Sequence, residues 1–387
     1  MQSLDIASSV VLSFLDFSAA FDTVDHNTLI NRLEHSFGIS GKALQLLISY
    51  LSHRSFVVKI GNTTSERQSL EFGVPQGSIL GPLFYSLYTK DLEKIANKHG
   101  INIHIYADDV VLYTKFENLD KFQKCHEDFL KWTQSNFLKL NKSKTQLLYI
   151  SRKNSKILKP IQIRLMGEEV AVQNNAKYLG VWIDENLSMT TQVNKVCSQG
   201  YFAIKNLWKI SSKLNNKQLK TQLIHTCILS KLNYCSSLYS FTSKQNQKKL
   251  DRLLKSGVRF INNITGIARR DPITPLVKEL HFLPIKYRSW FKINLIVYKC
   301  FNGLAPMYLN HLLIPRAGQS LRITRRANDI TYLCSHPLER LHYKNQCFRY
   351  VSPGLWNCLS QVIRESSNIE IFKSKLKTHY YELWNDT

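Results

Sequence analysis

The strongest constraint on this chain is a pair of adjacent carboxylates between two runs of β-branched and aromatic residues. Asp108 and Asp109 follow Ile103–Tyr106 and precede Val110–Tyr113. This composition predicts a β-hairpin with both acids at its turn. Successive side chains of a strand point to opposite faces, so the two carboxylates cannot both belong to a core. Like charges this close repel each other unless a cation lies between them. An isolated Asp-Asp pair is also compatible with an ordinary solvated turn. The choice between a solvated turn and a cation site therefore depends on the rest of the chain.

Charge is distributed unevenly along the 387 residues, a length that allows two or three structural units. Residues 1–184 carry 21 basic and 18 acidic side chains, whereas residues 185–387 carry 31 basic and 10 acidic ones. The net charge of +24 therefore belongs mainly to the second part. Such a surface attracts polyanions, and the aromatic residues among its basic ones suit nucleic acid better than an acidic membrane.

The sequence carries no sign of export or membrane insertion. No run approaches the roughly 18 apolar residues of a membrane span. The N-terminus has neither the basic start nor the cleavage site of a secretory signal. The eight cysteines show no disulfide-framework spacing. We therefore expect an intracellular protein.

A further carboxylate ends a strand near the N-terminus. Val10–Phe17 has the composition of a buried strand that ends on an acid, Asp16. A buried strand that runs into an acid is unusual unless the acid is paired or binds a metal. Small residues then lead to the ring of Phe21. Asp22 and Asp25 are better interpreted as a turn residue and a helix N-cap, because a helical pattern follows them.

A loop punctuated by Gly and Pro, residues 73–82, leads into an apolar helix predicted over 83–95. Glycines let the backbone approach a ligand closely, and a helix N-terminus supplies hydrogen-bond donors. Taken alone, the segment could also be a turn with a capped helix. Elsewhere the patterns predict an α+β protein with helices over 27–36, 41–52 and 119–138, hairpins over 56–72 and 156–173, and strands over 146–150 and 176–184. From residue 188 the chain becomes helical and basic, over 190–213, 216–231, 246–263 and 285–301.

Taken together, these stretches resemble the reverse transcriptases of non-LTR (LINE-type) retrotransposons. The similar segments correspond, in order, to the family's palm motifs A to D and its primer grip: Phe14–Asp22, Gly73–Ser78, Tyr106–Asp109, Leu140–Thr145 and Tyr178–Gly180. Residues 280–288, 303–306 and 355–357 resemble the C-terminal region of LINE elements of the chicken-repeat type. The resemblance covers nearly the whole chain, and five motifs in order make it specific.

The resemblance implies an α+β fold in three parts. We expect a polymerase palm over residues 1–186, with an antiparallel sheet and helices on one face. A helical thumb over 187–265 and a helical, basic C-terminal region over 266–387 would follow. The chain begins at the first palm strand, so we expect an N-terminally truncated reverse transcriptase that lacks the fingers and the upstream endonuclease. In the family the fingers help to grip the nucleotide, which leaves the activity of this chain open.

By resemblance, the catalytic residues are Asp16, Asp108, Asp109 and Lys144. Nucleotide addition is an in-line attack of a primer 3′-OH on the α-phosphate, and two divalent ions about 3.5–4 Å apart can hold the attacking and leaving oxygens. Mg²⁺ prefers carboxylate oxygens. The resemblance implies that Asp16 and Asp108 bridge two Mg²⁺ ions, or Mn²⁺, and that Asp109 supports them. Lys144 matches a lysine proposed as general acid for pyrophosphate, although most lysines are simply solvated.

The other matched positions surround the substrates. Phe21 matches the family's steric gate, a ring that would exclude a ribose 2′-OH, although a packed core aromatic is the alternative. The remaining positions contact nucleotide and template (Gly73, Pro75, Gln76 and Gly77) or form the primer grip (Tyr178, Leu179 and Gly180).

The implied function is that of an RNA-directed DNA polymerase. Its partners would be an RNA template, a DNA primer or target and deoxynucleoside triphosphates, without a membrane, in a nuclear or cytoplasmic ribonucleoprotein. The oligomeric state is not indicated. The alternative is a catalytically silent nucleic-acid-binding remnant, which missing fingers favour and intact carboxylates disfavour. A viral RNA-dependent RNA polymerase is disfavoured, because those enzymes usually carry Gly before the paired Asp and a polar residue at the position of Phe21.

Two further groups of side chains are candidates for binding. Cys334 and His336, with His342 and Cys347, suggest a metal site, but the first spacing is too tight for structural zinc, and we favour a core cysteine and a surface histidine. Five lysines of the second part are candidate phosphate contacts: Lys205, Lys209, Lys213, Lys217 and Lys220.

Overall fold

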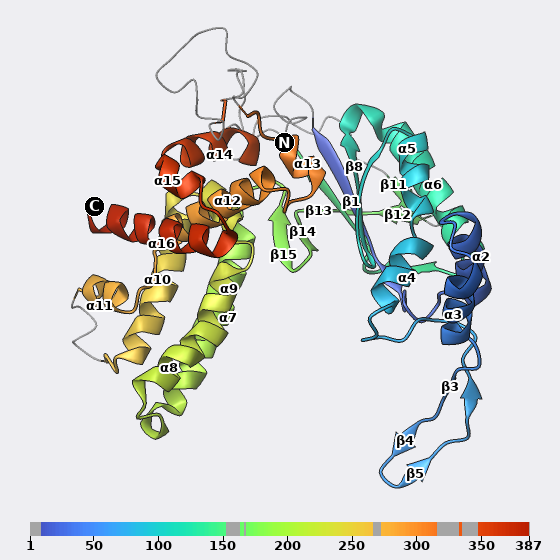
Figure 1. The fold of residues 1–387 in the computed structure, drawn as a ribbon, viewed down its shortest axis with the longest axis horizontal. Helices are drawn as coiled ribbons and strands as arrows, with labels where there is room; N and C mark the ends of the chain where they lie inside the picture. Colours follow the sequence, from blue (N-terminus) through green and yellow to red (C-terminus); the bar gives the residue numbers. More distant parts are fainter. Residues whose placement is uncertain are drawn as a thin grey trace. The chain divides into compact units, whose positions relative to one another are not determined.

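The computed structural model describes residues 9–151, 163–165, 168–265, 272–315, 333–334 and 347–386. The chain divides into two compact units, Ala7–Gly180 and a second that contains Val181–Thr387 (Figure 1). Each unit has its own buried apolar core. The candidate carboxylates belong to the first unit.

The first unit is built on a sheet with the strand order β13-β10-β1-β8-β7. Its central strand β1 (Val10–Leu15) pairs antiparallel with β8 (Asp109–Lys115) and with β10 (Gln146–Ile150). Strand β8 also pairs antiparallel with β7 (Asn102–Tyr106), whereas β13 (Val172–Gln173) runs parallel to β10. The predicted hairpin with two acids at its turn is therefore confirmed, and the predicted antiparallel pairing is confirmed for β10, β1, β8 and β7.

Helices lie along one side of this sheet in Figure 1. They are α2 (His26–His35), α3 (Gly41–Leu51), α4 (Gly81–Tyr88), α5 (Asp91–Lys98) and α6 (Leu119–Ser135). Alternate residues of β1, among them Val11 and Leu15, are buried in the core that these helices share with the sheet. Asp25 caps α2 as predicted, because its carboxylate accepts a hydrogen bond from the Thr28 N–H at 2.7 Å.

The single helix predicted over 83–95 is wrong, since α4 ends at Tyr88 and α5 begins at Asp91. The Thr89 hydroxyl donates to the Tyr85 carbonyl at 2.9 Å. This hydrogen bond satisfies one of the carbonyl groups at the C-terminal end of α4. Asp91 then lies in the first turn of α5, where a negative charge is favourable. Both helices bury an apolar face, so hydrophobicity alone could not reveal the break.

Short strand pairs complete the first unit. They are β2 (Phe17–Ser18) with β9 (Lys139–Leu140), β3 (Ser55–Phe56) with β6 (Gln68–Ser69), β4 (Lys59–Ile60) with β5 (Thr63–Thr64), and β11 (Ile163–Leu165) with β12 (Glu168–Val170). Strands β3 to β6 form the predicted first hairpin as a narrow arm that extends from the end of α3 (Figure 1). Residues 156–162 and 166–167 of the second predicted hairpin lie outside the described part of the chain.

The continuous strand predicted over 176–184 is also wrong. Strand β14 (Asn175–Tyr178) stops before Leu179 and Gly180, and β15 (Val181–Asp184) begins after them. Leu179 has φ +46° and Gly180 has φ +79°. Two successive positive φ values form a turn and not a strand, and leucine gives no local sign that it will adopt one.

The second unit is helical, as predicted. Its longer helices are α7 (Thr190–Lys209), α8 (Lys217–Ile224), α10 (Lys244–Ile261), α12 (Ile285–Phe301), α14 (Phe348–Asn357) and α16 (Ile369–Asn385). Shorter ones are η2 (Ser211–Lys213), a π-helical turn η3 (His225–Leu229), α9 (Ser230–Asn233), η4 (Ser236–Phe241), α11 (Thr274–Glu279), α13 (Met307–Asn310) and α15 (Gln361–Arg364). Because these helices form one compact unit, the division into a thumb and a C-terminal region stays a prediction. Among the described residues, none of the helices combines the length and the apolar character needed to cross a bilayer.

Candidate active site

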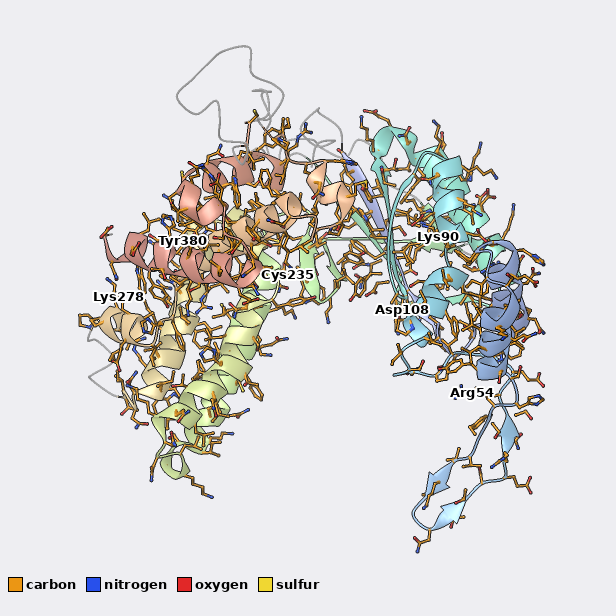
Figure 2. All side chains as sticks on the ribbon, viewed as in Figure 1. Arg54, Lys90, Asp108, Cys235, Lys278 and Tyr380 are labelled. Atoms are coloured by element: carbon orange, nitrogen blue, oxygen red, sulfur yellow. The ribbon has the colours of Figure 1, made fainter. Side chains whose placement is uncertain are left out.

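Three carboxylates meet at one end of the first unit's sheet. The register of β1 and β8 pairs Leu15 with Val110, so Asp16 and Asp109 are the next positions along the two strands. Asp108 lies in the turn that joins β7 to β8 (Figure 2). Partial burial raises the pKa of Asp109, and the negative charges of Asp108 and Asp16 raise it further. The structure thus brings the three predicted acids together.

The turn that carries Asp108 has an uncommon backbone. Ala107 adopts φ +52°, a conformation that residues other than Gly rarely take. Strained backbone of this kind is often found where a protein holds functional groups in place. The sequence showed the acids but gave no sign of this conformation.

Lys144 is the cation beside these acids. Its Nζ lies 3.5 Å from Asp16 Oδ2, an oxygen that is buried and accepts no hydrogen bond within the described chain. The loop that carries Lys144 is tied to Asp16, because the Asn141 N–H donates to the Asp16 carbonyl at 2.7 Å. This backbone contact, which sequence reasoning did not identify, holds the loop of Lys144 against Asp16.

A cleft of about 430 Å³ opens at this end of the unit. Its walls include seven of the predicted site residues, namely Asp16, Phe21, Pro75, Gln76, Gly77, Asp108 and Lys144. The other five predicted site residues are not among those that line it, namely Asp109, Gly73 and the primer-grip residues Tyr178, Leu179 and Gly180. Acids, a lysine, an aromatic ring and a Gly/Pro loop thus share one open cavity of nucleotide size.

Phe21 lies between the core and the cleft. Its ring stacks on Tyr85 with centroids 4.7 Å apart, and it also lines the cleft. Tyr85 is fully buried, and its hydroxyl has no hydrogen-bond partner in the described chain. Burial raises the pKa of Tyr85, and the charge of Asp108 adds to that effect. Tyr85 therefore supports Phe21 from behind, a role that sequence reasoning missed.

The loop that begins at Gly73 is fixed against the segment that follows β2. The Gly73 N–H donates to the Val24 carbonyl at 2.7 Å, and its own carbonyl lies 2.7 Å from His26 Nε2. Gly73 adopts φ +86°, and a Cβ at this position would lie 2.9 Å from the Asp22 Cα. Only glycine fits such a conformation at such a distance.

The predicted primer grip is only partly close to the acids. The Tyr178 ring packs against Phe14 with centroids 5.6 Å apart. Burial raises the pKa of Tyr178, and the charge of Asp109 raises it further. This tyrosine therefore interacts electrostatically with the acidic cluster. Leu179 and Gly180 instead form the turn that ends the first unit.

The five candidate lysines of the second unit do not form one exposed face. Lys220 is only 2% exposed, donates to the Asn263 side chain and lies over the Phe260 ring. Lys217 forms an ion pair with Glu279 at 2.9 Å. The chain is not helical between η2 and α8, so Lys213 and Lys217 do not belong to one continuous helix. In the C-terminal group, His336 and His342 lie outside the described residues, and Cys347 is buried.

The donor chemistry of the acidic cluster fits a divalent cation. Within the described residues, no set of three or more His, Cys, Asp or Glu side chains is close enough to enclose a metal by itself. Mg²⁺, however, usually keeps several waters and binds through one or two carboxylates together with substrate phosphates. Asp16, with its buried oxygen that accepts no hydrogen bond, and Asp108 offer such carboxylates to one cleft.

The antiparallel sheet, the acids at its end and the cleft define the palm of a template-directed polymerase. Residues 2–183 match the family described as reverse transcriptase (RNA-dependent DNA polymerase). This match covers just under half of the chain, and the chain is similar to the reverse transcriptases of non-LTR retrotransposons.

Several curated relatives come from Drosophila mobile elements. The probable RNA-directed DNA polymerase from transposon BS of Drosophila melanogaster is 26% identical over 276 residues, which cover 68% of this chain and 30% of the relative. The probable RNA-directed DNA polymerase from transposon X-element of the same species is 28% identical and covers 66% of this chain and 28% of its own length. The polymerase from mobile element jockey of Drosophila funebris is 26% identical over 65% of this chain and 28% of its own. The chain therefore spans less than a third of the length of these relatives.

Proposed function

We propose that this chain is an RNA-directed DNA polymerase that extends a DNA primer along an RNA template with deoxynucleoside triphosphates. The observation that carries the proposal is the shared cleft, because Asp16 and Asp108 line it together with Phe21 and Gln76. The relatives' names support the same activity.

Asp16, Asp108 and Asp109 are the residues that would hold two Mg²⁺ ions, with Mn²⁺ as an alternative. When bound, such ions supply stabilisation for the charge on the attacking and leaving oxygens of phosphoryl transfer. Lys144, beside Asp16, holds a proton at Nζ that the leaving pyrophosphate can accept.

The other cleft residues orient and select the substrates. Phe21, held by Tyr85, occupies the place where a ribose 2′-OH would clash. Gln76 and the backbone of the Gly73–Gly77 loop contact the nucleotide and template, and Tyr178–Gly180 contact the primer. The basic second unit binds the template–primer phosphates as thumb and C-terminal region, within a nuclear or cytoplasmic ribonucleoprotein.

Primer extension on an RNA template with Mg²⁺ tests the proposal on the full chain. We expect extension by the wild type and none by Asp108→Asn. Asp120→Asn is the matched control, because Asp120 is exposed on α6 and the chemical change is the same. Extension by Asp108→Asn would remove the carboxylate from the mechanism. Failure of the folded wild type to extend any primer while it still binds the hybrid would favour the alternative, a catalytically silent nucleic-acid-binding protein.

A further inference from the structure

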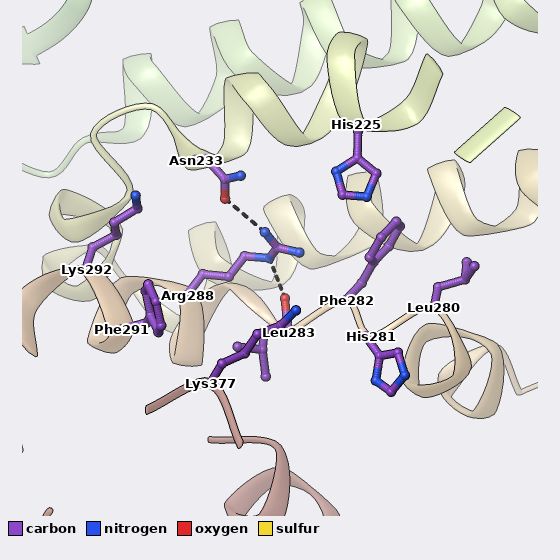
Figure 3. A pocket seen from close by; sticks show the side chains of 10 residues that line it. All are labelled: His225, Asn233, Leu280, His281, Phe282, Leu283, Arg288, Phe291, Lys292 and Lys377. Atoms are coloured by element: carbon purple, nitrogen blue, oxygen red, sulfur yellow. Dashed lines mark hydrogen bonds between the residues drawn. The ribbon is translucent and has the colours of Figure 1, made fainter. Parts of the chain in front are cut away.

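A second cavity, of about 300 Å³, lies within the helical unit among η3, α9, α12 and α16 (Figure 3). Cationic and aromatic side chains dominate its walls, and they include Arg288, Lys292, Lys377, Phe282 and Phe291. Two histidines, His225 and His281, line it as well. No acidic side chain belongs to the described residues that line it.

Arg288 forms the charged centre of this cavity. Its Nε donates to the Leu283 carbonyl at 2.6 Å, and one terminal nitrogen donates to Asn233 Oδ1 at 2.9 Å. The other terminal nitrogen has no hydrogen-bond partner among the described residues and points toward His225 and Phe282 (Figure 3). A guanidinium with free donors in a confined space suits an oxyanion such as phosphate.

The surrounding charges strengthen this preference. Burial lowers the pKa of Arg288 to about 10, which leaves it charged at neutral pH. Burial also lowers the pKa of His225, and the positive charges of Arg288 and Lys377 lower it further. Asp251 attracts Arg288 from outside the lining, but its Oδ1 accepts the Ile285 N–H at 2.9 Å. The cavity therefore presents a positive field to a ligand.

Two irregular backbone segments border the same cavity. His225 begins the π-helical turn η3, a distortion that is frequent at functional sites. His281 adopts φ +53° in the segment between α11 and α12. Both conformations are less favourable than a regular helix or loop, and both shape the cavity walls.

We propose that this cavity binds one unpaired nucleotide of a nucleic acid strand, with its phosphate at Arg288 and its base against Phe291. The volume lies at the lower end of ligand pockets, which suits a single nucleotide and excludes a duplex. Bases of single strands can be splayed out and stacked on aromatic side chains, whereas paired bases cannot. This binding goes beyond polymerisation and needs none of the three carboxylates.

The test compares binding of the full chain to a short labelled single-stranded RNA and to an RNA–DNA hybrid of the same sequence. We expect Lys292→Gln with Lys377→Gln to weaken single-strand binding about tenfold, because the variant removes two of the cations that line the cavity around the phosphate site. The slope of log affinity against log salt should fall by about 0.7 for each phosphate that the variant no longer neutralises. Binding of the hybrid should change much less.

Three further variants make the result decisive. Lys244→Gln with Lys248→Gln removes the same charge from exposed positions of α10 and should leave single-strand binding nearly unchanged. Lys292→Arg with Lys377→Arg keeps the charge and should retain binding, which separates ligand contact from folding. Asp108→Asn should bind the single strand like the wild type. Failure of the polymerase proposal can therefore be distinguished from failure of the nucleotide site. Equal loss in the pocket and α10 variants, or equal loss for single strand and hybrid, would overturn the nucleotide site.

Discussion

The side-chain amide of Gln76 donates to both carboxylate oxygens of Asp22, at 3.0 and 3.3 Å. Gln76 lines the cleft, and Asp22 directly follows Phe21 in the chain. The contact therefore links the Gly/Pro loop to the segment that carries the proposed steric gate. We infer that Asp22 is a positioning residue for Gln76.

Asp22→Ala should leave Gln76 free to rotate. A hydrogen bond to a charged partner contributes about 1.5–3 kcal/mol when buried, and less at an exposed pair such as this one. We therefore expect the KM for deoxynucleotide to rise about threefold to tenfold, with little change in kcat, in steady-state primer extension. Gln76→Ala should have the same effect, and the double variant should show no further loss. Additive losses would mean that the two residues act independently.

Phe21 and Tyr85 should together set sugar selectivity. Phe21→Val should raise ribonucleotide incorporation, because the ring no longer blocks a 2′-OH. Tyr85→Leu removes the stacked partner of Phe21, and since such pairs contribute about 0.5–1.5 kcal/mol, we expect selectivity to fall about twofold to tenfold. The measurement is the ratio of ribonucleotide to deoxynucleotide incorporation in competition.

Tyr85→Phe is the control for this pair. It keeps the ring and removes a buried hydroxyl that has no hydrogen-bond partner in the described chain, so selectivity should stay as in the wild type. Thermal unfolding of each variant shows whether the core has been damaged. Unchanged selectivity in folded Phe21→Val would show that the ring is core packing only.

The acidic hairpin could be predicted because its signals are local. Strand composition on both sides of Asp108 specifies the turn, and the helix N-cap at Asp25 follows from the pattern after it. The approach of Asp16 to Asp109 depends on strand pairing between distant segments, and resemblance to a family was needed to expect it. The structure supplies the register that explains it.

Other features could not be predicted because they depend on tertiary contacts. The position of Lys220 in a basic, helical stretch could not show that it is buried beside Asn263. Leucine at position 179 has no preference for the positive φ that ends β14. The contact between Asp22 and Gln76 joins two polar residues of separate loops, and neither sequence pattern specifies a partner.

Asp109 should lower the stability of the first unit at neutral pH when no divalent ion is present. Its pKa is raised in the folded state, so above the unfolded value the folded state binds more protons, and stability falls as pH rises through the raised pKa. Asp109→Asn removes the carboxyl group whose raised pKa causes this loss of stability. We expect a higher unfolding temperature than that of the wild type at neutral pH and no gain in acid, where the wild-type carboxyl is protonated.

Mg²⁺ provides the control for the Asp109 experiment. If the acids hold the ion, millimolar Mg²⁺ should raise the unfolding temperature of the wild type and reduce its difference from Asp109→Asn. The control variant Asp120→Asn should show neither effect. A wild type that Mg²⁺ leaves unchanged would argue against ion binding by the free protein.

His126 should make the first unit sensitive to mild acid. It is buried in α6, with Nδ1 2.8 Å from the Phe122 carbonyl, and burial lowers its pKa from 6.5 to about 4. The bond assigns the proton to Nδ1 of a neutral ring. Between these two values the unfolded chain binds the extra proton, so stability is lost as pH falls from 6.5 toward 4, by up to about 3 kcal/mol.

His126→Leu should abolish this dependence of stability on pH, and the exposed control His53→Gln should keep it. Urea unfolding of the first unit across this pH range measures the difference, and an unchanged acid sensitivity in folded His126→Leu would assign the effect to other groups.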